Sequence, residues 1–176
     1  MSMVIDGSNG LTYPNSATNG GYINGGTAVA STSGTSIDFT GIPSWVKRVT
    51  VISSAISTSG TSDWGIQLGT SGGIVSTGYV GQTVNQLNGS QSPTTFAQTI
   101  YSGLASVASY GQITLLLANA STNLWVISGS IITSGTIYSG ISGYNITLSS
   151  ALTTVRIKTG NGTDTFDLGS INILYE

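Results

Sequence analysis

The sequence predicts an all-β protein: an antiparallel β-sandwich, jelly-roll-like, with about eight or nine strands and an extended N-terminal arm. Three observations predict this class. Short segments alternate apolar with polar residues, as half-buried strands do. Segments rich in Gly, Ser and Thr, which form turns, separate them. The chain of 176 residues is 39% hydrophobic but only 6% charged, so it has enough apolar residues to fold and a surface made of hydroxyls and amides.

Alternation identifies the half-buried strands. Residues 49–51 and 66–68 each place two apolar side chains on one face and a polar one on the other. Residues 155–158 alternate Val and Ile with Arg and Lys, and residues 171–173 place two Ile side chains on one face. We therefore expect each of these strands to have one buried and one solvated face.

Two further segments, residues 113–117 and 124–127, are apolar apart from Thr114. A strand of this kind is buried on both faces or lies at a subunit contact. Residues 75–80 and 144–148 are additional strand candidates.

One segment leaves an alternative open. Residues 96–107 carry apolar side chains at the spacing of a helix face, namely Phe96, Ile100, Leu104 and Val107. The Thr, Ser and Gly residues between them are weak helix formers. A short helix is therefore an alternative here.

The hexapeptide STSGTS occurs at residues 31–36 and again at residues 57–62, and its core TSGT returns at residues 133–136. The residues that flank the copies differ, which argues against a repeat unit. Gly supplies a positive φ, and Ser and Thr hydroxyls bond to the nearby backbone, as turns require. We expect a turn between strands at each copy.

Residues 1–28 differ from the rest of the chain because they are rich in Asn and Gly, with scattered apolar residues. Pro14 and the Gly-rich turns suit an extended arm that becomes ordered only against something else. We therefore expect an N-terminal arm for docking or trimerisation over residues 1–28 and a β-sandwich domain over residues 29–176. The first residues have no basic region followed by an apolar core, so we expect no signal peptide.

Missing residue types argue against several functions. The chain has no His and no Cys, which removes Ser-His-Asp and Cys-His catalysis and the common zinc sites. It has no Gly-rich nucleotide-binding fingerprint, and we expect no cofactor. Four cations in two separate segments, with a net charge of −2, do not form the basic face that nucleic acid requires. No apolar run approaches the roughly 18 residues of a membrane span.

The acidic residues leave one enzymatic alternative. Glycoside hydrolysis needs two carboxylates, and Asp164 and Asp167 are the closest non-terminal pair. Residues three apart on a strand point to opposite faces, so a polar hairpin before the last strand is favoured. Calcium held by Asn161, Asp164 and Asp167 is a further alternative, although their spacing matches no complete calcium loop.

Aromatic residues raise the question of a sugar-binding surface. Trp64 and Trp125 lie in apolar strand segments and Trp45 lies at a strand entrance, so we expect all of them to be packed. Several Tyr residues near Gly-rich loops would instead form an adaptable surface together with Ser and Asn. This tentative surface-binding set is Tyr79, Tyr101, Tyr110, Tyr138 and Tyr144.

Two segments carry a resemblance to a known group of proteins. GTSIDFTGIPSWVKRVTV, residues 34–51, and NGTDTFDLGSINILYE, residues 161–176, resemble the beginning and the end of a domain of bacteriophage tail-fibre, head-fibre and related virion surface proteins. Residues 65–69 and 113–129 resemble the same domain in the same order. GLTYPNSAT, residues 10–18, is similar to short segments of phage fibre stems.

The resemblance implies a non-enzymatic β-sandwich that is displayed on a virion as a homotrimer. The first interpretation is a short tail fibre or tip that adheres to the host surface through polysaccharide, with trimerisation adding avidity. An alternative is a capsid decoration or head-fibre protein that docks on other virion proteins through residues 1–28. A glycan-cleaving enzyme is the third. The resemblance assigns no catalytic, cofactor or metal residues.

Overall fold

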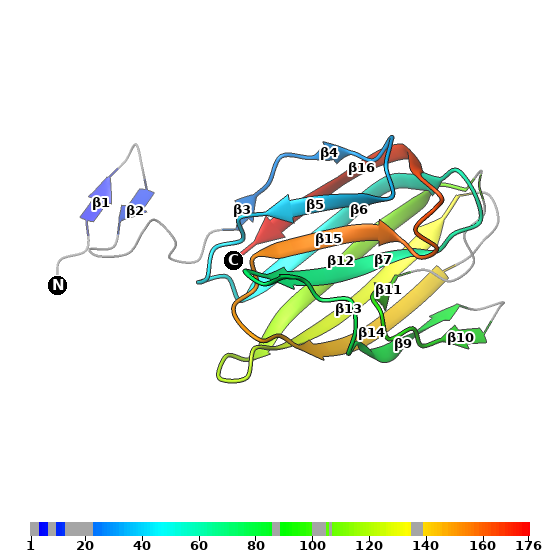
Figure 1. Ribbon diagram of the computed structural model, residues 1–176. Helices are drawn as coiled ribbons and strands as arrows, with labels where there is room; N and C mark the ends of the chain where they lie inside the picture. The colour runs from blue at the N-terminus through cyan, green and yellow to red at the C-terminus, as the bar shows by residue number, and fades with distance from the viewer. Residues whose placement is uncertain are drawn as a thin grey trace.

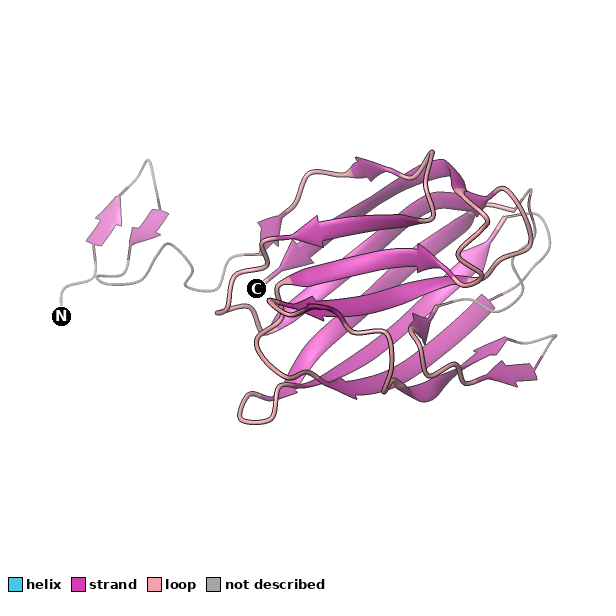
Figure 2. Cartoon of the chain, viewed as in Figure 1, coloured by secondary structure: helices cyan, strands magenta, loops and turns pink. Residues whose placement is uncertain are grey.

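The structure is a computed structural model that describes residues 4–6, 10–12, 23–85, 89–99, 105, 107–134 and 139–176. Regular structure within these residues is β-strand throughout, as Figure 2 shows. Two antiparallel sheets stack face to face (Figure 1), which confirms the expected all-β class in the arrangement of a sandwich. Within the described ranges there is no helix of the length and apolarity needed to span a membrane.

The larger sheet has nine strands in the order β10-β9-β14-β13-β12-β6-β16-β3, and β4 also pairs with β16. Its strands are β3 (Asn24–Gly25), β4 (Val29–Ala30), β6 (Arg48–Thr58), β9 (Val80–Asn85), β10 (Gly89–Gln91), β12 (Ser109–Asn119), β13 (Leu124–Thr133), β14 (Ser139–Thr147) and β16 (Phe166–Tyr175).

The smaller sheet has five strands in the order β11-β7-β15-β5, with β8 paired to β7. Its strands are β5 (Ser36–Thr40), β7 (Trp64–Thr70), β8 (Gly73–Ile74), β11 (Ala97–Gln98) and β15 (Thr154–Thr159). The strands outnumber those expected from the sequence because several have only two residues, which is too few to show alternation.

The core lies between the two sheets, and alternation predicts correctly which side chains face it. In β15, Val155 and Ile157 are fully buried, while the intervening Arg156 remains partly exposed. Val49, Val51, Ile66, Leu68, Ile171 and Ile173 are buried as well. The solvated face expected for residues 66–68 is wrong, because Gln67 is also buried and its side chain donates to the Thr95 carbonyl.

The Trp residues are packed as expected. Trp64 and Trp125 are each only 2% exposed and belong to the core. Trp45 is half-buried and packs against the core beside Tyr175, with 5.9 Å between the ring centroids. None of these indole rings is a platform on the surface.

The side chains of residues 113–117 and 124–127 also alternate between the core and the outer face of the sheet. Ile113 and Trp125 face the core, but Leu116 and Val126 lie opposite each other on the outer face and are 48% and 40% exposed. The described residues therefore cover only one side of these strands. Their outer side chains are available for a contact with another subunit.

Both copies of the hexapeptide STSGTS form turns, as predicted. Residues 32–35 lead from β4 to β5, and residues 59–61 lead from β6 to β7. Each turn thus carries the chain from the larger sheet to the smaller one. The third copy includes residues 135–136, which lie outside the described residues.

Two other sequence-based expectations need comment. The strand predicted over residues 75–80 is wrong: residues 75–79 form the connection between β8 and β9, with Gly78 at a φ of +87°. Of the alternative helix over residues 96–107, the first part contains β11 instead. Residues 100–104 and 106 lie outside the described residues.

Most of the expected N-terminal arm also lies outside the described residues. Within residues 1–28, β1 (Val4–Asp6) and β2 (Gly10–Thr12) pair with each other in a two-stranded sheet. Nearer the sandwich, β3 pairs with the end of β16, and the Gly26 amide donates to the Ile173 carbonyl at 2.7 Å. Residues 24–30 thus continue the larger sheet at its edge.

Tyr79 anchors the connection between β8 and β9 to the core. Its ring is fully buried. Its hydroxyl accepts a hydrogen bond from the Leu68 amide at 2.7 Å and donates one to the Val75 carbonyl at 3.1 Å. Burial raises the pKa of Tyr79 to about 12, because the phenolate would lose its hydration.

This raised pKa predicts how stability depends on pH. An unfolded Tyr loses its proton near pH 10, whereas folded Tyr79 holds its proton until about pH 12. The contribution of Tyr79 to the free energy of unfolding is therefore complete below pH 10 and is lost as the pH rises between these values. Urea titrations between pH 9 and pH 12 should show a fall of roughly 2 kcal/mol from this group. The stability of Tyr79→Phe should fall less steeply with pH than that of the parent protein. Equal slopes for the two proteins would contradict this assignment.

Candidate functional site

The structure separates the five Tyr residues that the sequence suggests as a binding surface. Tyr79 and Tyr144 are 0% and 3% exposed, so their rings lie in the interior and cannot form part of an exposed surface. Tyr110 is 40% exposed on the outer face of β12. Tyr101 and Tyr138 lie outside the described residues. The described Tyr residues therefore do not gather at one site.

The acidic pair predicted near the last strand is separated too. Asp167 is exposed in β16, whereas Asp164 lies in the connection before it and accepts a hydrogen bond from the Ser62 amide at 2.9 Å. The Asn161 Oδ1 atom accepts from the amides of Thr163 and Asp164, both at 3.0 Å. These oxygens thus close a turn.

The turn does not belong to a hairpin, which corrects the sequence-based interpretation, because β15 and β16 lie in different sheets. Of the side chains proposed as calcium ligands, Asn161 and Asp164 form hydrogen bonds within the connection between the sheets, whereas Asp167 lies in β16. Within the described ranges, no three acidic side chains form a group that could hold a metal ion.

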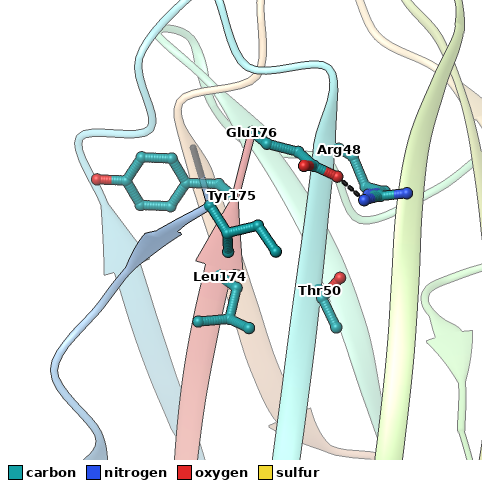
Figure 3. A pocket seen from close by; sticks show the side chains of 6 residues that line it. Arg48, Thr50, Leu174, Tyr175 and Glu176 are labelled. Carbon is teal, nitrogen blue, oxygen red and sulfur yellow. Dashed lines mark ion pairs between the residues drawn. The ribbon is translucent and has the colours of Figure 1, made fainter. Parts of the chain in front are cut away.

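One hollow lies at the end of the sandwich where β3 and β16 meet, and Figure 3 shows it. Arg48 of β6 and Glu176, next to the end of β16, form an ion pair across it. Leu174 and Tyr175 complete one wall. Its volume of about 30 Å³ is room for a single water molecule, so it is not a ligand site.

The outer face of the larger sheet carries exposed aliphatic side chains. Ile141 of β14 and Val84 of β9 lie directly opposite each other and are 68% and 44% exposed. The strands β9, β12, β13 and β14 contain no charged residue. Charged residues are depleted at the centres of protein interfaces, so this face has the composition of a subunit contact.

A larger cleft lies at the opposite end of the sandwich from Arg48 and Glu176. Three chain segments line it: residues 61–63 after β6, residues 91–98 around β10 and β11, and residues 160–161 after β15. Its volume is about 370 Å³. We call it the distal cleft, because the described chain joins the sandwich at the other end, at β3 (Figure 1).

A hydrogen-bond network fixes one wall of the distal cleft. The Gln98 side chain is 1% exposed, and its Nε2 group donates to Asp63 Oδ2 at 2.7 Å and to Gln91 Oε1 at 3.4 Å. Behind it, Thr83 Oγ1 donates to the Gln98 carbonyl at 2.6 Å and lies 3.3 Å from the Tyr144 hydroxyl. Burial raises the pKa of Tyr144, so its hydroxyl stays protonated within this network.

A second wall of the distal cleft is the segment that carries Phe96, which can lie close to β7 because Gly65 has no side chain. Phe96 lies against Gly65 of β7, and the neighbouring Gln67 side chain donates to the Thr95 carbonyl at 2.8 Å. A Cβ atom at position 65 would overlap the Phe96 ring and the Ala97 carbonyl oxygen. The absence of a side chain on Gly65 therefore positions the segment that carries Phe96 and Gln98.

The lining of the distal cleft contains one carboxylate, that of Asp63. Asp164 and Lys158 lie beside the cleft with opposite charges. Asp164 accepts a hydrogen bond from the Ser62 amide, whereas the Lys158 Nζ atom lies 5.0 Å from the Phe96 ring centroid and donates to the Gly160 carbonyl at 3.4 Å. Burial and the nearby Arg156 charge both lower the pKa of Lys158.

Sequence reasoning did not find this cleft. Asp63, Gln98 and Asn161 come from distant parts of the chain, and no local motif joins them. Asp63 directly follows the second STSGTS turn and directly precedes β7.

Comparison of the chain with protein-family models, curated proteins and solved structures found no match.

The close approach at Gly65 can be tested by substitution. Gly65→Ala should destabilise the protein by about 1–3 kcal/mol, because the backbone of the 93–98 segment must move. Gly143→Ala is the matched control in the larger sheet, since no atom lies within 4 Å of its added Cβ, and it should change stability by about 0.5 kcal/mol or less. Urea denaturation measures both. Similar stabilities for the two variants would contradict the packing argument.

Proposed function

We propose that the protein is a non-enzymatic bacteriophage virion protein: a short trimeric tail fibre or tip whose jelly-roll-like sandwich adheres to a glycan on the host surface. Its site of action is the assembled virion. The proposal starts from the sequence resemblance of residues 34–51 and 161–176 to phage virion surface proteins.

One structural observation carries the proposal. The two segments that bear the resemblance are far apart in sequence but lie side by side, since residues 173–175 of β16 pair with residues 49–51 of β6. The Phe166 amide donates to the Gly34 carbonyl and the Lys47 amide to the Glu176 carbonyl, both at 2.8 Å. A chance likeness of two unrelated segments would not be expected to coincide with one contiguous part of the fold.

The arrangement of the surfaces supports an adhesive role. The chain joins the sandwich at β3, at one end, whereas β10, which contributes to the distal cleft, lies toward the other end (Figure 1). An adhesin needs this separation, because its attachment to the particle and its attachment to the host must not compete. The uncharged outer face around Ile141 and Val84 is a third surface, which supports assembly with other copies of the chain.

A capsid decoration or head-fibre protein is the second candidate. In this role, residues 1–28 would dock the sandwich on the capsid shell. The observation that favours it is the edge formed by β3 and β4, where Ile23 and Val29 are 60% and 39% exposed. Apolar side chains beside the arm would add to a contact with a neighbouring virion protein.

Immunogold electron microscopy of intact virions, with an antibody against this chain, distinguishes the candidates. Gold at the tail tip is the expected result for a fibre or tip protein. Gold spread over the head would instead establish the decoration protein. Particles that carry no gold, from a preparation in which the same antibody detects the purified protein, would refute the virion proposal in both forms.

The proposed trimer predicts a mass. Size-exclusion chromatography with light scattering should give about 54 kDa, three times the 17.9 kDa of one chain. Ile141→Glu should shift the protein toward monomer, because it places a charge on the exposed aliphatic face. Lys47→Glu also changes charge at an exposed position, but Lys47 precedes β6, which β12 and β13 separate from the strand of Ile141, so the mass should stay unchanged. A monomer at high protein concentration would contradict the trimer.

A further inference from the structure

We propose that the distal cleft binds a neutral, hydroxyl-rich ligand, a sugar residue of a host-surface glycan. This inference rests on the proposed adhesive function and deepens it, because it assigns the ligand site and the charge class of the ligand. It moves the site away from the Tyr residues and onto Asp63, Gln91 and Asn161.

The dimensions of the cleft suit such a ligand. Small-molecule sites in proteins enclose about 300–1,000 Å³, and the distal cleft, at about 370 Å³, lies near the lower bound. The hollow beside Arg48 and Glu176, at about 30 Å³, is far too small. The hollow on the outer face around Thr114 and Ser128 has about 270 Å³ and lies on the face that we assign to subunit contact.

The lining offers the groups that sugar hydroxyls require. A sugar hydroxyl both donates and accepts hydrogen bonds. The Asp63 carboxylate accepts, and the Gln91 amide can do both. The Asn161 Nδ2 group donates, because its Oδ1 atom already accepts two backbone amides within the turn. Pro93 and Phe96 add an apolar patch, which suits the C–H groups of a sugar ring.

The polar groups are fixed before any ligand arrives. Gln98 is buried and holds Asp63 through its Nε2 group at 2.7 Å. Two backbone amides, those of Thr163 and Asp164, hold the Asn161 Oδ1 atom. A site whose side chains are already ordered loses less conformational entropy when it binds, so even a small ligand can be retained.

The charges select against anionic ligands. Asp63 is the ionised side chain in the lining, and Asp164 lies beside the cleft. Lys158, which contacts the lining residues Phe96 and Gly160, also lies beside the cleft, with a charge opposite to that of Asp164. An acidic sugar or a phosphate would bring its negative charge against the Asp63 carboxylate, which disfavours its binding.

Nuclear magnetic resonance of the full chain tests the inference. Uniformly 15N-labelled protein is titrated with millimolar methyl glycosides of glucose, galactose, mannose and N-acetylglucosamine, and in parallel with glucuronic acid and inorganic phosphate. The expected result is that at least one neutral glycoside shifts the amide signals of Asp63, Gly160 and Asn161, while the anions do not. Shifts confined to another part of the chain, shifts with the anions alone, or no shift with any neutral glycoside would overturn it.

Two substitutions sharpen the test. Asp63→Asn keeps an acceptor for Gln98 but removes the charge, and Gln91→Ala removes an exposed side chain that lines the cleft. Each should weaken binding about tenfold or more, as expected for the loss of a hydrogen-bonding group. Gln82→Ala is the matched control. Gln82 is also exposed and lies in β9, the strand that pairs with β10, but it is not part of the lining. Equal affinity in all these proteins would refute the site.

The outcomes keep the two proposals apart. If sugars bind in the cleft but no gold labels virions, the site stands and the virion function fails. If gold labels the tail tip but the glycosides leave the signals of Asp63 and Asn161 unchanged, the virion function stands and the assignment of the cleft fails.

Discussion

The pairing of β16 with β6 is the contact on which the rest of the sandwich depends. It runs from Phe166 opposite Thr58 to Tyr175 opposite Val49, and it joins the last strand to the first long one. β16 then supports β3 and β4 on its other side. The register shifts along this pairing, where Gly169 lies opposite Ala55 with positive φ at both residues, so the two strands curve together. Without this pairing the larger sheet would lose an entire side.

The same pairing creates the distal cleft. The segments that follow β6 and precede β16 must leave the sheet together, and the Ser59 amide donates to the Thr165 carbonyl at 2.8 Å. In the smaller sheet, β7 and β15 continue from these segments side by side. Asp63 therefore lies next to Gly160, and the Gly160 amide donates to the Asp63 carbonyl at 2.6 Å. The cleft is therefore a consequence of two strands crossing from one sheet to the other at the same end.

This origin explains what the sequence could and could not predict. Alternation is local, so it identified the buried faces of β6, β7, β15 and β16 correctly. Local sequence also predicted that STSGTS is a turn, but not that it crosses between sheets. Tyr79 and Tyr144 lie beside Gly residues in sequence, yet they are buried because Leu68 and Thr83, distant in sequence, supply partners for their hydroxyls. The cleft has no local signal, since Asp63 and Asn161 meet only through sheet order.

The three surfaces place a constraint on assembly. A closed cyclic trimer turns each chain about one axis, so equivalent ends of all three chains point in the same direction along it. If the uncharged outer faces around Ile141 meet near that axis, the ends with β3 point to one side and the distal clefts to the other. Three weak sugar contacts on one side then act together, and linking them raises the overall affinity well above that of one cleft. Weak binding by a single cleft and firm attachment by the virion are therefore compatible properties of the same fold.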